Sequence, residues 1–375
     1  MALAAPIELL PNELLDEIIY LLTSPPPSAN SLHRPPDTQI ARSWKRDLRN
    51  LSLTCSRFSV LVRPLLFAHG CCNLEDIDEY LAFLSKSELT RYVTSLVITE
   101  SDGSHKSGYS AWWRRLFSSL VPRQLTIVAS PLAIGNLFGI IPPEENSWAF
   151  EISHQLVQLE LDQGYQPRAL TDKHATILEH LPWTSMVFNE SSSLKAYNHY
   201  EYFLYKVPSI FHRWNDWVLK HKLSEGRQSN SSSPLQNLAS FTYIAVFPFY
   251  NHVERVLEAV ITMKNLHTLK IQLGPCQLDR ATEIEQRGSL DPSDPWMELS
   301  TGYSLIAHTV SAMGTKGCLE KFIACDYQME PVRAEIDKIL GDILCDGPWT
   351  HDGHGTWTKK ALGGNGESMT VVDGE

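Results

Sequence analysis

The sequence predicts an α+β protein in which a short all-helical module precedes a longer body of alternating strands and helices. Three observations support this fold class. Apolar residues recur at helical spacing in two stretches before residue 67, strand-like and helical stretches then alternate as far as residue 344, and a glycine-rich stretch ends the chain. The length of 375 residues and the apolar fraction of 43% are sufficient for a large buried core.

The first predicted helix begins at Pro11, because proline lacks an N–H and the first helical position does not need one. Leu14 and Ile18 form one apolar ridge along this helix, and Leu15 and Ile19 form a second ridge beside it. A module of this size has too small an interior to enclose both ridges, so we expect some of these apolar side chains to stay exposed and to contact a partner. The alternative is a helical cap whose apolar residues all face the body of the same chain.

A proline-rich stretch over residues 23–46 follows, and it can neither continue a helix nor join a sheet. The sequence therefore predicts a long insertion loop here. Asp47 can cap a second helix, and Pro64 limits that helix near its end. The apolar residues of this second helix step by three and four positions: Leu48, Leu51, Cys55, Phe58 and Val62.

The two helical stretches resemble the F-box. The first carries the pattern Leu10-Pro11-x-Glu13-Leu14-Leu15-x-x-Ile18-Ile19 and the second carries Leu51-Ser52-Leu53-Thr54-Cys55-Ser56-Arg57-Phe58. The stretch Arg63-Pro64-Leu65-Leu66-Phe67 is similar to the ending of F-box proteins from filamentous fungi. Two features depart from the family: the insertion is longer than the usual few residues, and Phe58 stands where many members have tryptophan.

The resemblance implies that residues 1–70 are an F-box module, with the insertion at 23–46. Such a module docks on a Skp-type adaptor, which links it through a cullin scaffold to a ubiquitin-conjugating machine. The residues carried over as the adaptor surface are Leu10, Pro11, Leu14, Leu15, Ile18, Leu51, Cys55 and Phe58.

Residues 71–346 are predicted to form the body. Strands are expected at 93–99, 124–129, 156–161, 241–247, 267–273 and 319–325, and helices at 74–84, 112–120, 171–181, 211–222, 253–263, 303–313 and 332–344. Leu96, Ile127 and Leu159 recur at the period of stacked strand-plus-helix units. The fragment Leu156-x-x-Leu159-x-Leu161 resembles the strand of a leucine-rich repeat, which implies an irregular, leucine-rich-repeat-like α/β solenoid that recognises a target. The alternative is a compact α/β domain with a mixed sheet.

Three further stretches are predicted to lack regular structure. Residues 225–234 and 280–296 are expected to be surface loops, and residues 347–375 form a glycine-rich tail that is predicted to be disordered. An aromatic stretch from Tyr197 to Trp217 can fill a core, line a partner surface or stack nucleic acid, and we favour the core.

Composition excludes several function classes. The net charge of −11 offers no general attraction for nucleic acid or anionic membranes, and no apolar run is long enough to cross a bilayer. The first residues lack the charge pattern of a secretory signal, and the seven cysteines form no CxxC pair, so we expect reduced thiols and a cytoplasmic or nuclear location.

No catalytic motif is present: Gly-x-Ser-x-Gly, the Walker pattern, a dinucleotide fingerprint and His-Glu-x-x-His are all absent. We therefore expect no cofactor. His351, Asp352 and His354 could ligate a metal, but a solvated hairpin or coil is the favoured interpretation.

The sequence thus predicts a non-catalytic substrate receptor of an SCF-type (Skp–cullin–F-box) ubiquitin ligase, with an unknown target protein. The alternatives are an F-box-bearing scaffold that acts outside a ligase and an enzyme with an unrecognised site.

Overall fold

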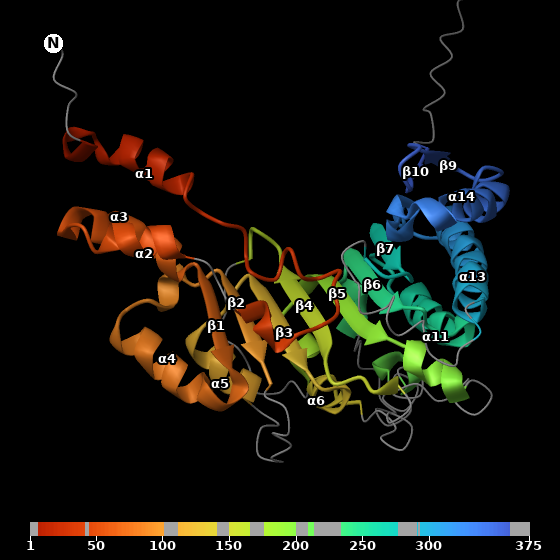
Figure 1. Cartoon of the computed structure of the whole chain (residues 1–375), viewed down its shortest axis with the longest axis horizontal. Coiled ribbons are helices and arrows are strands. Elements are labelled where there is room, and N and C mark those ends of the chain that lie inside the picture. Colours follow the sequence, from red (N-terminus) through yellow and green to blue (C-terminus); the bar gives the residue numbers. More distant parts are fainter. Residues whose placement is uncertain are drawn as a thin grey trace, which may run out of the picture.

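The computed structural model describes residues 7–41, 45–100, 112–140, 150–165, 176–199, 209–213, 234–276, 291 and 293–360. These residues form a mixed α/β fold on one open ten-stranded sheet, which confirms the predicted combination of helices and strands. Strands β1 to β8 follow one another in chain order, and β10 and β9 complete the sheet. Figure 1 shows an arc with the N-terminal helices at one end and the β9–β10 hairpin at the other.

The strands of the sheet are β1 (His69–Asn73), β2 (Ser95–Thr99), β3 (Gln124–Ala129), β4 (Gln155–Leu161), β5 (Trp183–Ser192), β6 (Ser240–Val246), β7 (Thr268–Gln272), β8 (Lys321–Ala324), β9 (Trp349–His351) and β10 (Thr356–Lys359). Strand β4 is antiparallel to both of its neighbours, and β10 is antiparallel to β8 and β9. The other pairs are parallel. All six predicted strands are present in the sheet.

Helices lie along the outer side of the arc, where alternate strand residues meet them in one continuous apolar core (Figure 1). They are α4 (Ile77–Lys86), α5 (Trp112–Ser119), α6 (Pro131–Leu137), α8 (Ile177–His180), α11 (Tyr250–Ile261), α13 (Asp294–Lys316) and α14 (Glu330–Leu344). Helix α13 begins at Asp294, so the end of the predicted 280–296 loop is helical. Within the described residues no helix combines the length and apolar content needed to span a bilayer.

Several predicted segments lie partly outside the described residues. Of the helices expected at 171–181 and 211–222, the described parts are α8 and the 3-10 turn Ile210–Arg213. Of the loop expected at 225–234, only the last residue is described, and it begins the 3-10 turn Pro234–Asn237.

The N-terminal helical module contains α1 (Asn12–Tyr20), α2 (Arg46–Ser52) and α3 (Ser56–Phe67). Its small core is separate from that of the body and consists of Leu15, Ile19, Leu48, Phe58 and Val62. The prediction of one continuous second helix was wrong. The chain breaks after α2, and the Cys55 sulfur then accepts a hydrogen bond from the Phe58 N–H and caps α3.

Two details of these helices also differ from expectation. Asp47 lies in the first turn of α2 instead of capping it, and Pro64 lies inside α3, which continues to Phe67. The packing of α3 against α1 and α2 supports the helix across the position that proline leaves without an N–H donor.

The predicted disorder of residues 347–375 was wrong over residues 349–359. Here β9 and β10 form a hairpin that joins the sheet through β8, and Trp349 and Trp357 are buried beneath it. A Cβ on Gly314 of α13 would come within 2.6 Å of the Trp349 ring, so this indole packs directly on the helix backbone. Burial of two indoles outweighs the glycine content that suggested disorder. Residues 361–375 lie outside the described residues.

The body therefore extends beyond both of its predicted limits, residues 71 and 346. Its sheet begins at His69, inside the range assigned to the module, and extends to Lys359, inside the range assigned to the tail.

Replacing Trp357 with alanine is expected to destabilise the protein by about 3 to 5 kcal/mol, because the side chain is 1% exposed and its loss leaves a cavity. Urea unfolding measures this difference. The exposed neighbour Thr358, changed to alanine, serves as the control and should alter stability by less than about 0.5 kcal/mol. A Trp357→Ala protein as stable as the control would show that the hairpin is not part of the core.

Candidate functional site

Helix α1 buries one of its two apolar ridges and exposes the other. Leu15 is 0% exposed and Ile19 is also buried, whereas Leu14 is 47% and Ile18 is 42% exposed. The exposed ridge continues beyond the helix through Leu21 and Leu22. We use the term α1 strip for these four exposed side chains, Leu14, Ile18, Leu21 and Leu22. The surplus of apolar surface expected from the sequence is therefore present.

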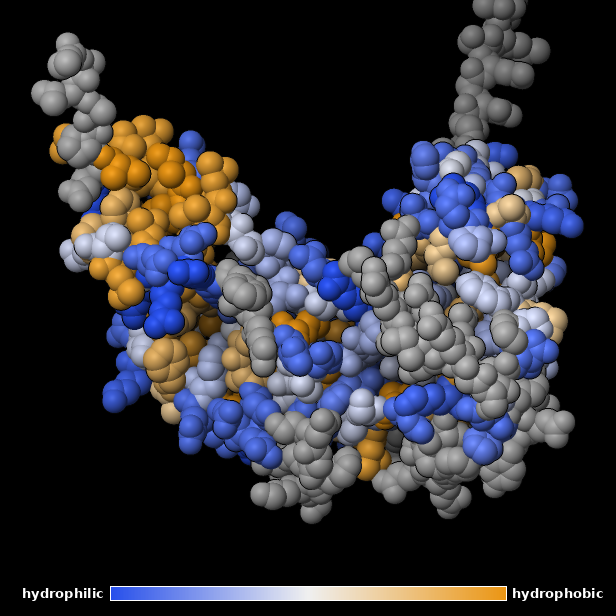
Figure 2. Space-filling model, viewed as in Figure 1, coloured by the Kyte–Doolittle hydropathy of each residue, from blue (hydrophilic) through white to orange (hydrophobic). Residues whose placement is uncertain are grey.

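The module carries further exposed apolar side chains. Ile7 and Leu9 precede α1, Leu53 lies between α2 and α3, and Val60 lies on α3, and all four are exposed. Figure 2 shows the result: hydrophobic colour gathers on the end of the molecule that carries the module, while the visible surface of the body is mixed and mostly polar. A contiguous apolar surface of this kind typically marks a site of protein association.

The eight residues assigned to the adaptor surface are exposed, half-buried or fully buried in the structure. Pro11, Leu14 and Ile18 are exposed. Leu10, Leu51 and Cys55 are half-buried and pack against the module core.

The assignment was wrong for Leu15 and Phe58, because both lie within the module core and present no surface to a partner. The sequence assignment also missed residues. Leu21 continues the spacing of Leu14 and Ile18, so the periodicity could have identified it. Leu53 lies inside the F-box-like pattern but was not assigned to the surface, and nothing in the sequence marked Val60.

Arg57 fixes the start of α1 on α3. Its Nη2 donates to the Leu10 carbonyl at 2.6 Å and to Asn12 Oδ1 at 2.7 Å, and its Nε donates to the same Oδ1 at 2.9 Å. A guanidinium holds its donors in a rigid plane, so these contacts set the direction of the helix as well as its position. The α1 strip is thereby presented outward from a fixed helix.

The proline-rich insertion is a strap across the inner side of the sheet, defined here as residues 23–41. Figure 1 shows it leaving α1, crossing the strands and returning toward α2. Asn189 Nδ2 on β5 donates to the carbonyls of Leu32 at 2.7 Å and Arg34 at 2.9 Å. Gln272 Oε1 on β7 accepts a hydrogen bond from His33 Nδ1 at 2.6 Å. The strap therefore joins the module to strands far along the chain.

The strap lies over the strand residues that point away from the helices. One row runs across five neighbouring strands in register: Val128, Leu156, Asn189, Ile244 and Gln272. All five are buried, and most of their neighbours along the strands belong to the helix-facing apolar core. Sequence alone gave no indication of this contact, because one asparagine and one glutamine in strands carry no signature of a backbone partner.

Replacing Asn189 with alanine is expected to cost about 1 to 3 kcal/mol, because two carbonyl groups of the strap lose their donor. Limited proteolysis should also cut faster within residues 23–41. The control is Asn30→Ala, an exposed position on the strap itself. Equal stability and equal cleavage rates in the two variants would contradict a strap held by Asn189.

Two buried carboxyls of the body have hydrogen-bond partners in the interior. Glu190 accepts hydrogen bonds from the Ser209 and Tyr243 hydroxyls, and burial raises the pKa of this carboxyl to about 7. Burial also raises the pKa of Asp326, which accepts hydrogen bonds from two backbone N–H groups and from Tyr303. Each carboxyl thus satisfies donors in the interior.

The remaining sequence candidates have these outcomes. In the described part of the chain no group of three His, Cys, Asp or Glu side chains is placed to hold a metal ion. His351 instead stacks on Trp357 with ring centroids 4.4 Å apart. All seven cysteines are free. Tyr197 and Phe211 of the aromatic stretch are buried in the core, and positions 200–208 and 214–217 lie outside the described residues.

Comparison of the chain with family models, with curated proteins and with solved structures finds no match. The function is therefore inferred from the geometry and from the sequence patterns.

Proposed function

We propose that the protein is a non-catalytic substrate receptor of an SCF-type ubiquitin ligase. In this proposal the helical module is an F-box that binds a Skp-type adaptor, and the body is a leucine-rich-repeat-like solenoid that holds a target protein. The observation that carries the proposal is the α1 strip, an apolar ridge that the module leaves exposed although its own core is filled.

The energetics favour an adaptor surface larger than α1 alone. Burying four Leu or Ile side chains that are already partly covered contributes about 4 to 8 kcal/mol, at roughly 25 cal/mol per Å² of apolar surface. Association costs about 4 to 15 kcal/mol in lost motional freedom. The α1 strip therefore needs the neighbouring exposed residues, such as Leu9, Leu53 and Val60, to give a stable complex.

The body supports the second half of the proposal. Strands in chain order, mostly parallel, with helices on the outer side, resemble the arrangement of a leucine-rich-repeat horseshoe. Strand β4, antiparallel to both neighbours, departs from that pattern and makes the solenoid irregular. A rigid link between module and body would keep a bound target at a set distance from the adaptor and raise its local concentration at the conjugating enzyme.

Co-expression of the full chain with a Skp-type adaptor and a cullin, followed by affinity purification through the chain, tests the proposal. We expect both partners to co-purify. Recovery of the adaptor without the cullin would favour a scaffold that acts outside a ligase. Failure to recover the adaptor would overturn the proposal.

A further inference from the structure

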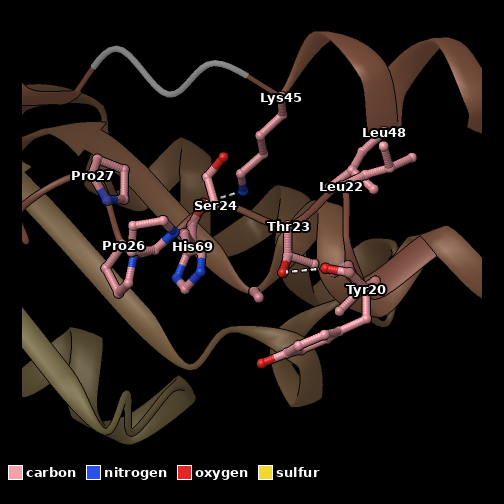
Figure 3. Close-up of a pocket in the computed structure, with 12 residues that line it drawn as sticks. Tyr20, Leu22, Thr23, Ser24, Pro26, Pro27, Lys45, Leu48 and His69 are labelled. Atoms are coloured by element: carbon pink, nitrogen blue, oxygen red, sulfur yellow. Dashed lines mark hydrogen bonds between the residues drawn. The ribbon is translucent and has the colours of Figure 1, made fainter. Parts of the chain in front are cut away.

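A cavity of about 450 Å³ lies where the module meets the edge of the sheet (Figure 3). Thr23, Ser24 and three prolines of the strap line one side, and Lys45 and His69 are among the residues that line the remainder. The cavity is large enough for a phosphate group and its first water molecules. Leu22 of the α1 strip is among the residues that line it, whereas Leu14, Ile18 and Leu21 are not.

Lys45 is the cationic group of this cavity. Its Nζ donates to the carbonyls of Leu66 and His69, both at 2.7 Å, and thereby caps the end of α3. An ammonium has three donors, so one N–H is left without an acceptor among the described residues. No described carboxylate forms an ion pair with Lys45, and burial lowers its pKa, as expected for a cation without a counter-ion.

His69 adds a second basic group. Its Nδ1 is hydrogen bonded to Ser95 Oγ at 2.8 Å, and its ring also contacts the Ser24 backbone. Burial and the neighbouring Lys45 both lower the pKa of His69. The cavity therefore brings two basic side chains together in a chain whose net charge is −11, and an anion placed here would stabilise the charged form of each.

Ser24 places a modifiable hydroxyl at the same cavity. The residue is exposed, and it lines the same cavity as Lys45 (Figure 3). Ser24 is followed by Pro25, and a serine before a proline is the arrangement that proline-directed protein kinases modify. Neither neighbour of Ser24 carries a charge that would oppose a phosphate.

We propose that this cavity is a phosphate site, filled by a phosphoserine at position 24 or by a free phosphate ion. In the covalent case, a kinase transfers the γ-phosphoryl group of a nucleoside triphosphate to Ser24 Oγ. The Oγ–P bond forms, the bond from the γ-phosphorus to the bridging oxygen breaks, and the hydroxyl proton and a nucleoside diphosphate leave. The dianion then pairs with the Lys45 ammonium and ties the start of the strap to the end of α3.

Phosphorus NMR of the full chain carrying phosphoserine at position 24 tests the covalent source. A solvated phosphoserine has a second pKa of about 6. We expect this value to fall by about one unit in the protein, relative to a free phosphopeptide of residues 18–30, because the nearby ammonium stabilises the dianion. Lys45→Met should abolish the difference and Lys45→Arg should retain it. The peptide reference keeps the test decisive if Lys45→Met fails to fold.

Titration of the unphosphorylated Ser24→Ala variant with inorganic phosphate tests whether a free phosphate ion fills the cavity. Saturable binding that weakens at least tenfold in Ser24→Ala/Lys45→Met would assign the site to a free anion. A phosphoserine pKa equal to that of the peptide, together with no saturable binding of phosphate, would overturn the proposal. Neither arm uses the adaptor, so either outcome is independent of the receptor function.

Discussion

Replacing Leu14 and Ile18 together with aspartate is expected to weaken adaptor binding at least 100-fold. Both side chains belong to the α1 strip, and in the complex each carboxylate would be buried without a partner. A 100-fold loss corresponds to about 2.8 kcal/mol, a modest part of the cost of burying two unpaired charges. Isothermal titration of the purified chain with a Skp-type adaptor measures the change.

The matched control makes the same chemical change on the body. Phe83 on α4 is 49% exposed and Ile261 on α11 is 60% exposed, so Phe83→Asp with Ile261→Asp alters two apolar surface residues of similar exposure. We expect this variant to bind the adaptor like the unmodified chain. Both double variants should remain folded, because all four side chains face solvent. Equal affinity in the two variants would remove α1 from the adaptor surface.

Raising the pH from 5 to 8 is expected to lower the free energy of unfolding by about 3 kcal/mol through Glu190 alone. Burial raises the pKa of Glu190 to about 7 in the folded chain, from 4.5 for an unperturbed carboxyl. Between these two values the folded state keeps a proton that the unfolded state releases. Stability therefore falls as the pH rises through this window and levels off above it.

Glu190→Gln isolates this effect. The amide resembles the protonated carboxyl in shape and does not titrate, so the variant should match the unmodified chain near pH 5 and exceed its stability near pH 8. Urea unfolding at both pH values gives the comparison. Glu254→Gln on α11 changes an exposed carboxyl and should leave the pH dependence unaltered. The same pH dependence in Glu190→Gln as in the unmodified chain would show that Glu190 does not keep its proton.

Periodicity predicted the elements whose two faces differ most. Strand β3 has its expected limits, and helix α5 differs by one residue at its end, because apolar residues alternate in the first and recur at helical spacing in the second. Strand β1 was missed because His69–Asn73 contains no alternation of large apolar residues. Strand β5 was missed because its second half turns polar, with Asn189 and Glu190 bound to partners distant in sequence.

The α1 strip shows a different limit. Sequence identified two apolar ridges on α1 but could not decide which one faces outward, because both consist of leucine and isoleucine. The choice depends on where α3 places Phe58 and Val62, and these side chains meet Leu15 and not Leu14. The packing of the strap on the sheet and the pairing of the C-terminal hairpin with β8 were not predicted, because both depend on contacts between residues far apart in the chain.

Carbene footprinting of the full chain, alone and bound to a Skp-type adaptor, tests the central claim most directly, because it labels side chains according to their exposure. We predict strong labelling of Leu14, Ile18 and Leu21 in the free chain and loss of that labelling in the complex, with Phe83 and Ile261 labelled equally in both. An α1 strip that is unlabelled in the free chain, or that stays labelled when the adaptor is bound, would contradict the account.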